Sequence, residues 1–159
     1  MSAEFRIERL GAQGDGVAAT ERGPVYIPFT LADERVTASR NGDRADLLAI
    51  VEPSPLRVEP ACRHFGECGG CALQHMEERA YREWKRGRVV EAVRSRGIET
   101  EIAPLAPCAP GERRRVTLSA RRTEAGMLLG YNRALSHTIV DIRECPVARP
   151  EIVAALEPL

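Results

Sequence analysis

Residues 62–76 read CRHFGECGGCALQHM, and this stretch separates two parts of the chain that differ in character. Before it, short apolar runs alternate with glycine-rich turns. After it, the pattern becomes helical and then returns to strands. Three cysteines, Cys62, Cys68 and Cys71, fall within ten residues and raise three alternatives: a metal site, disulfides or a small core. The organisation and the function both depend on which alternative holds.

The spacing of these cysteines is C-x5-C-x2-C, which is typical of a metal site. Two intervening residues let one tight turn point both sulfurs at a single centre. Gly69 and Gly70 are expected to supply positive φ angles and a close backbone approach. Cys145 is followed by Pro146, as is the last ligand in many iron–sulfur runs. A ligand so far away in sequence is normal when a β-sheet brings it back.

The alternatives differ in how well they fit. Five cysteines are an odd number, and a reducing compartment disfavours disulfides. Four independent core cysteines would be a coincidence at this spacing. A structural zinc site with four cysteine ligands is chemically possible, although such sites usually use two close pairs and Cys145 has no close partner. Cys108, between prolines, is expected to be a bystander. His64 and His75 are expected at the surface or behind the ligands rather than as ligands.

Residues 1–57 predict a small OB-like antiparallel barrel made of five short strands. The strand runs are EFRIERL, GVAAT, GPVYIPF, RVTASR and ADLLAIVE, and NGD at 41–43 is a strong hairpin signal. GAQGDG at 11–16 lacks the spacing of a dinucleotide-binding motif and indicates an ordinary turn. EPSPLRVEP at 52–60 reads as a linker.

The remainder predicts a helix followed by an antiparallel sheet. The helix covers Met76–Arg96 and ends at RSRG. A helical period places together Tyr81, Trp84, Val89, Val90 and Val93, of which Trp84 and the valines are expected in the core. Three strands follow at 114–122, 126–132 and 137–142, the first two joined by TEAG. A second helix begins at RPEIVAALEPL, with Pro150 in its first turn. Because the chain stops in or just beyond this helix, we expect a fragment of something longer.

The predicted fold class is therefore mixed β and α+β. Its predicted domains are a barrel at 1–57, a linker and cysteine segment at 58–75, and an incomplete α+β domain at 76–159. No stretch approaches the roughly 18 to 20 apolar residues of a membrane span, and MSAEFRIERL has no secretory signal pattern. We expect a cytoplasmic monomer without a membrane partner.

Charge is balanced overall but uneven along the 159 residues. All 23 basic residues except Lys85 are arginine, whose planar donors suit phosphate, although codon preference explains this equally well. Residues 111–122 hold five arginines against Glu112, whereas residues 1–57 hold seven arginines against nine carboxylates. The barrel alone should therefore bind RNA weakly. The candidate RNA contacts are Arg113, Arg115, Arg121 and Arg122.

The segment CRHFGECGGCALQH resembles the cluster-binding segment of the S-adenosylmethionine-dependent 5-methyluridine RNA methyltransferases. LGAQGDGVA…GPVYIPFTLADERV is similar to their TRAM domain, a small RNA-binding barrel. SPLRVEPACRHFGECGGCALQH and EWKRGRVVEAV resemble their linker and the helix that follows it. HTIVDIRECPVARPEI resembles the segment that carries their fourth ligand. The resemblance covers the whole chain and corresponds to the N-terminal half of the family.

This resemblance implies methylation of C5 of a uridine in structured RNA, with 23S rRNA as the expected substrate. It implies that Cys62, Cys68, Cys71 and Cys145 bind a [4Fe–4S] cluster, which we expect to be structural. In the family, the S-adenosylmethionine site, the nucleophilic cysteine and the general base lie in a C-terminal domain. No catalytic or S-adenosylmethionine-binding residue is therefore assigned in this chain, and Cys108 is not the nucleophile.

Two other functions remain open. One is a stand-alone TRAM-type RNA-binding module with a structural iron–sulfur or zinc site and no catalysis. The other is a zinc-bearing structural domain with no role in RNA binding.

Overall fold

The computed structural model describes residues 2–124, 126–134 and 136–156, and the chain forms two compact units. Unit 1 comprises Met1–Glu59 and His75–Leu105, and unit 2 comprises Pro60–Gln74 and Ala106–Leu159. The chain thus leaves unit 1, passes through the three clustered cysteines in unit 2, and returns. The predicted domain boundaries at 57 and 75 stay a prediction.

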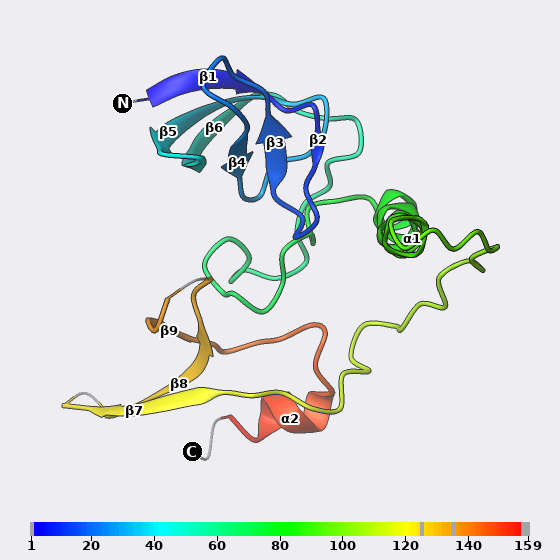
Figure 1. Ribbon diagram of the computed structural model, residues 1–159. Coiled ribbons are helices and arrows are strands. Elements are labelled where there is room, and N and C mark those ends of the chain that lie inside the picture. Colours follow the sequence, from blue (N-terminus) through cyan, green and yellow to red (C-terminus); the bar gives the residue numbers. More distant parts are fainter. Residues whose placement is uncertain (1, 125, 135, 157–159) are drawn as a thin grey trace. The chain divides into compact units, whose positions relative to one another are not determined.

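Unit 1 is built on a curled six-stranded sheet with the order β1-β5-β6-β4-β3-β2 (Figure 1). This confirms the expected OB-like architecture, although β4 and β6 pair in parallel and the other neighbours are antiparallel. The strands are β1 Ser2–Arg6, β2 Arg9–Leu10, β3 Gly16–Ala18, β4 Val25–Ile27, β5 Arg35–Asn41 and β6 Arg44–Glu52.

The run predicted as the first strand is two short strands, β1 and β2. β1 pairs with β5 and β2 pairs with β3, so the chain changes partner between them. At the change, the Ile7 amide donates to the Glu34 carbonyl at 2.8 Å and the Glu8 amide donates to the Val17 carbonyl at 2.9 Å. One run of alternating apolar and polar residues therefore pairs with two different strands, β5 and β3.

Two predicted turns are confirmed. Asn41 pairs with Arg44 across the β5–β6 hairpin, and Gly42 has a φ of 66°, which a glycine adopts without strain. In the loop between β2 and β3, the Gly11 amide donates to the Asp15 carbonyl at 2.7 Å, as expected of an ordinary turn.

The core of unit 1 follows the two-residue period of its strands. In β5, Val36 and Ala38 are fully buried while Arg35 and Thr37 are partly exposed, because successive side chains point to opposite faces of a sheet. The buried cluster contains Phe5, Ile7, Ala18, Val25, Ile27, Val36, Ala38 and Ala45.

A buried ion pair joins the barrel to the segment that the sequence predicts as a linker. The Glu34 carboxylate is fully buried and accepts hydrogen bonds from the amides of Leu31 at 2.8 Å and Ser54 at 3.2 Å. Arg57 donates from Nε and Nη2 to its two oxygens, at 2.5 Å and 2.9 Å. Burial raises the pKa of Glu34, but Arg57 and the two amides together outweigh this effect and lower it.

The ends of the cysteine excursion are bonded to each other inside unit 1. The Val58 amide donates to the His75 carbonyl at 2.9 Å, and the Glu77 amide donates to the Leu56 carbonyl at 2.8 Å. Residues 59–74 therefore form a closed loop whose base is a short antiparallel pairing.

His75 is fully buried at this base, which contradicts an expected position at the surface. Burial, followed by the charge of Arg57, lowers the pKa of His75 to about 4, while a backbone hydrogen bond with Thr30 and the charge of Glu34 oppose the shift. The sequence could not indicate this, because only the fold brings Thr30 and Arg57 to His75.

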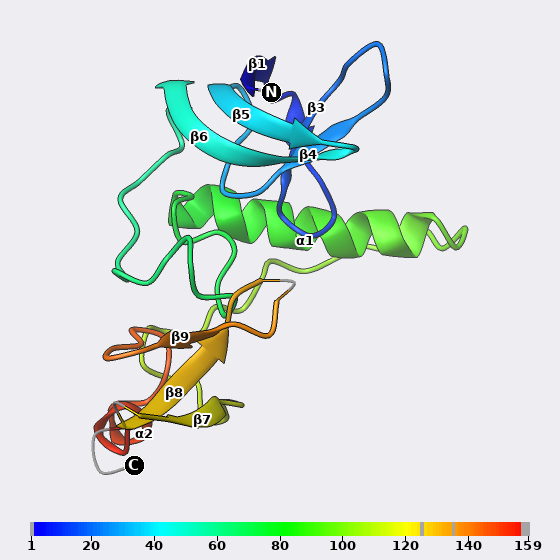
Figure 2. The ribbon, with the colours of Figure 1, turned by 90° about the vertical axis from the view of Figure 1, so that its left-hand side faces the viewer.

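Helix α1 spans Glu78–Arg94 (Figure 2) and confirms the expected helix. The Glu77 carboxylate caps it by accepting from the amides of Arg79 and Ala80. The expected packing is wrong, because α1 has no buried residue and Val89 is 48% exposed. Tyr81 and Val90 are nine residues apart, or two and a half turns, so they lie on opposite sides of the helix and form no single apolar face.

Unit 2 contains a three-stranded antiparallel sheet, β7-β8-β9, and helix α2 (Figure 1). The elements are β7 Ser119–Thr123, β8 Gly126–Asn132, β9 Ile139–Asp141 and α2 Pro150–Ala154. They confirm the three predicted strands and the second helix, which starts at a proline. The first strand is shorter than predicted: Arg113 forms an isolated bridge with Ala148, and the regular ladder starts only at Ser119. One residue of the predicted turn TEAG, Ala125, lies outside the described residues.

Within the described part of the chain, we find no helix with the length and apolarity that crossing a bilayer requires.

Candidate metal centre

The four cysteines singled out by their spacing line one small pocket in unit 2, with a cavity volume of about 20 Å³. Cys62, Cys68 and Cys71 come from the excursion, and Cys145 follows β9. All four are free thiols of intermediate exposure. Cys108 is exposed and is absent from the lining, as expected of a bystander.

The loop that carries the first three cysteines is held by its own backbone. The Phe65 amide donates to the Cys62 carbonyl at 3.1 Å, and the Cys68 amide donates to the His64 carbonyl at 2.9 Å. The left-handed position is Gly66, with a φ of 94°. The expectation of positive φ at both Gly69 and Gly70 is therefore wrong.

Close approach explains Gly69 instead. Its amide donates to the Asn132 carbonyl at the end of β8, at 2.9 Å. A Cβ at this position would lie 2.7 Å from that carbonyl oxygen and 2.9 Å from the Ala134 nitrogen. Cys68 also forms an isolated antiparallel β-bridge with Arg133, the residue after Asn132. These backbone contacts hold the cysteine turn against the end of β8.

A second fastening joins the loop to the segment before Cys145. The Arg63 amide and guanidinium both donate to the Glu144 carboxylate, at 3.0 Å and 2.8 Å. The Arg143 amide donates to Nε2 of His64 at 3.2 Å. His64 therefore contributes to the scaffold beside the cysteines, in line with its expected supporting position.

The thiols influence one another electrostatically. Burial is the largest cause of the raised pKa values of Cys62 and Cys68, and the charges of other cysteines of the set raise both further. Backbone N–H groups act in the opposite direction. The His64 backbone does so at Cys62, and the Gly70 amide does so at Cys68, 3.4 Å from its sulfur. The site brings together thiols that would repel one another when ionised, and it supplies backbone donors to their sulfurs.

In residues 2–124, 126–134 and 136–156, no group of three or more His, Cys, Asp or Glu side chains has the arrangement needed to hold a single metal ion.

The four predicted RNA-contacting arginines do not form one group. Arg113 lines the cysteine pocket, while Arg115 lies in the irregular stretch before β7. Arg121 and Arg122 are exposed on β7 opposite Leu128 and Met127. Because they are adjacent in a strand, their side chains project from opposite faces of the sheet.

Sequence reasoning missed Tyr131, which also lines the pocket. Its ring lies 3.8 Å from the position of a Cβ on Gly70, and it shares the pocket lining with Cys145 and Arg113. Burial, followed by the charge of Cys145, raises the pKa of Tyr131 to about 12. The signal in the sequence was weak: one aromatic residue in a strand normally indicates packing.

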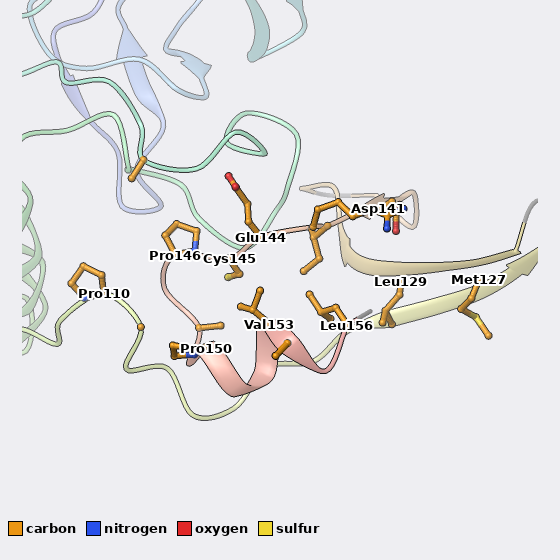
Figure 3. A pocket seen from close by; sticks show the side chains of 16 residues that line it. Pro110, Met127, Leu129, Asp141, Glu144, Cys145, Pro146, Pro150, Val153 and Leu156 are labelled. Carbon is orange, nitrogen blue, oxygen red and sulfur yellow. The ribbon is translucent and has the colours of Figure 1, made fainter. Parts of the chain in front are cut away.

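Unit 2 also contains a larger groove of about 970 Å³, with apolar residues from β8, α2 and the segment after β9 (Figure 3). Val153 projects from α2 toward the segment of Cys145 and Pro146, and Leu156 and Leu129 border the groove further along (Figure 3). Cys145 thus stands between this groove and the cysteine pocket, since it lines both.

No family model matches the chain, but it is similar to several proteins named RNA methyltransferases. It is 62% identical over 159 residues to an uncharacterised RNA methyltransferase of Mesorhizobium japonicum, a match that covers 100% of this chain and 38% of the relative. It is 46% identical over 159 residues to an uncharacterised RNA methyltransferase of Caulobacter vibrioides, covering 98% of this chain and 38% of the relative.

A third relative has a more specific name. The chain is 38% identical over 162 residues to the 23S rRNA (uracil(1939)-C(5))-methyltransferase RlmD of Pectobacterium atrosepticum, covering 96% of this chain and 36% of the relative. The chain therefore spans less than two fifths of the length of these relatives and matches their N-terminal portion. The chain is therefore similar, over almost its whole length, to the N-terminal portion of proteins named RNA methyltransferases, which include 23S rRNA uracil-C5 enzymes.

Proposed function

We propose that this protein is the RNA-binding and metal-holding portion of an S-adenosylmethionine-dependent RNA (uracil-C5) methyltransferase that acts on 23S rRNA. Cys62, Cys68, Cys71 and Cys145 are the proposed ligands of a [4Fe–4S] cluster. The observation that carries the proposal is that these four cysteines, 83 positions apart at the extremes, line one pocket. The name of the Pectobacterium relative supports the reaction and the substrate.

The donor set fits such a group. Four thiols suit soft metals and iron–sulfur clusters, and the one carboxylate in the described lining, Glu144, is paired with Arg63. The raised pKa values keep the Cys62 and Cys68 thiols protonated near neutral pH, so binding a metal as thiolates would release their protons. A cluster of four irons and four sulfides is larger than the 20 Å³ cavity, so the thiols would have to turn outward to admit it.

The cluster would supply a covalent link between the cysteine loop and the segment after β9. Both segments are already fastened by Arg63–Glu144 and His64–Arg143. A structural role is therefore proposed. Methyl transfer from S-adenosylmethionine requires no electron transfer through this portion.

The barrel, β7 and Arg115 would bind RNA, with phosphate contacts supplied by Arg115, Arg121 and Arg122. An unpaired loop would present its bases to arginine planes. A stand-alone RNA-binding module with the same metal site and no catalysis is the second candidate, because no catalytic residue is assigned in this chain. We expect a cytoplasmic monomer in either case.

Metal analysis tests the proposal. The protein is purified without oxygen, and bound iron, acid-labile sulfide and zinc are measured with a visible spectrum. About four irons and four sulfides per chain are expected. Cys68→Ser and Cys145→Ser should lose them, while Cys108→Ser should keep them. Stoichiometric zinc in a colourless sample would overturn the cluster and leave a structural zinc site.

Methylation distinguishes the two candidate functions. A longer form of this protein, extended to the length of the Mesorhizobium relative, is assayed with S-adenosylmethionine and undermodified 23S rRNA. It should add methyl groups to the RNA at C5 of a uridine. RNA binding without incorporation would favour the non-catalytic module.

A further inference from the structure

We infer that Tyr131 and Arg113 are positioning residues for Cys145 in the metal centre: the Tyr131 hydroxyl donates to the Cys145 sulfur, and the Arg113 guanidinium offsets the negative charge of the thiolates. The inference rests on the proposed metal site and adds two residues that neither the family resemblance nor the cysteine spacing assigns.

Tyr131 contacts both halves of the cysteine set. It lies in β8, where it pairs with Val140 and is partly buried. Its ring lies near Gly70, between Cys68 and Cys71, and its side chain lines the same small pocket as Cys145. A phenol in this place can donate its proton to a thiolate, since sulfur in that state is only an acceptor.

The surroundings of Gly70 show how closely the Tyr131 ring approaches the cysteine turn. A Cβ there would lie 3.4 Å from the Cys68 sulfur and 3.8 Å from the Tyr131 ring. The ring therefore lies directly against the turn that carries two of the proposed ligands. Tyr131 links this turn to Cys145 without any main-chain hydrogen bond between the two.

Arg113 is suited to balance the negative charge of metal-bound thiolates, because its guanidinium is not paired with a carboxylate. The neighbouring arginines 63, 133 and 143 form ion pairs with Glu67, Asp141 or Glu144. Within the described residues, Arg113 forms no ion pair with a carboxylate, although it lines the pocket together with Tyr131 and Cys145. Its backbone is fixed by pairing with Val147 and Arg149 on either side of Ala148.

The chemistry favours such a pair of residues. Hydrogen bonds to cluster sulfurs and nearby charge set the reduction potential of iron–sulfur centres. Partners behind metal ligands also hold those ligands in place, and their loss typically costs about 10- to 100-fold in metal affinity. Arg113 would then act at the metal centre and not, as the charge pattern alone predicts, on the RNA.

Tyr131→Phe tests the inference, because it removes only the hydroxyl and keeps the ring against Gly70. The protein is reconstituted with iron and sulfide without oxygen. Its metal content, the rate of iron transfer to a chelator and the midpoint potential are measured. We expect full loading, iron transfer about 10-fold faster than in the wild type, and a more negative potential. Tyr26→Phe, the same change in the barrel, should leave all three values unchanged.

Arg113 gives an independent test. Arg113→Gln should speed iron transfer and lower the potential, and Arg113→Lys should restore part of both because it keeps the charge. A loaded Tyr131→Phe protein whose transfer rate and potential equal those of the wild type would overturn the inference and leave the metal site intact. A wild-type protein that takes up no metal would overturn the proposed metal site, and this inference with it.

Discussion

The amide of Gly69 donates a 2.9 Å hydrogen bond to the carbonyl of Asn132, and the space between the two backbones admits no side chain. This contact fastens the cysteine turn to the end of β8. It stands next to the Cys68–Arg133 bridge, so the positions of Cys68 and Cys71 depend on it.

Gly69→Ala should therefore destabilise unit 2. The added Cβ would be 2.7 Å from a backbone oxygen, which cannot move aside as a flexible side chain would. We expect a loss of about 1–3 kcal/mol, typical of overpacking, and reduced metal content. Amide hydrogen exchange at Gly130 and Ile142 reports the stability of this sheet.

Gly87→Ala is the matched control, because nothing lies within 4 Å of its Cβ position in α1. It should stabilise the helix by about 0.5–1 kcal/mol. Equal protection of the β8 amides in Gly69→Ala and the wild type would contradict the role given to this contact.

His75 predicts a loss of stability in mild acid. Its pKa in the folded protein, about 4, lies below the ordinary 6.5, so the unfolded chain binds a proton that the folded chain excludes. The stability is complete above pH 6.5 and declines as the pH falls toward 4, by on the order of 3 kcal/mol. Urea unfolding followed by the fluorescence of Trp84, the single tryptophan, measures this in unit 1.

The variant His75→Gln should flatten this dependence between pH 6.5 and 4.5, because the amide does not titrate. Glu34 acts at lower pH: its lowered pKa gives a contribution that is present above its ordinary value near 4.5 and is lost as the pH falls below it. A wild-type slope that persists in His75→Gln would show that another group binds the proton.

Breaking the buried ion pair should cost more than breaking an exposed one. Arg57→Met leaves the Glu34 carboxylate without its cation in a fully buried position, and we expect a loss of about 3–5 kcal/mol. Arg35→Met, whose partners Glu4 and Glu52 are exposed, should cost at most about 1 kcal/mol.

The double variant Glu34→Gln/Arg57→Met should lose less than the sum of its single variants, because the unpaired charge is gone. Trp84 fluorescence in urea measures all of them at pH 7. Additive losses would mean that the two side chains stabilise unit 1 separately.

The exposed arginines of β7 should contribute to RNA binding through charge. Replacing Arg121 and Arg122 by alanine is expected to weaken binding of a 23S rRNA fragment and to reduce the slope of log K against log salt by about 0.7 for each of the two that contacts a phosphate of a single strand. Filter binding between about 50 and 200 mM salt measures this slope.

Replacing Arg94 and Arg96, two arginines at the end of α1, is the control for general charge. An equal effect of both double variants would argue for nonspecific attraction and against a defined contact by β7.

Local pattern predicted most elements of the fold. The alternation in β5, the Asn41-Gly42 hairpin and Pro150 at the start of α2 all act within a few residues, so the sequence displays them. The division of EFRIERL into two strands could not be predicted, since it depends on Glu34 and Val17 as partners.

The site was predictable in its ligand candidates but not in its surroundings. Spacing and the following proline identified the four cysteines, because those features reflect the geometry of a turn. The roles of Tyr131 and Glu144, and the close backbone approach that requires glycine at position 69, depend on contacts between segments more than fifty residues apart. The periodicity of a single sequence carries no information about such contacts. The same limit applies to His75, whose burial is created by the closing of the excursion.

The split of each unit into two stretches has a consequence for the timing of synthesis. Cys145 follows Cys71 by 74 residues, and at about 5–20 residues per second the ribosome needs roughly 4–15 seconds to make that interval. During this time the barrel and its excursion can close at Val58 and His75, while β8, the strand to which Gly69 is fastened, is still missing. Three thiols of the pocket are then made, on a loop whose base can already close, before the fourth exists.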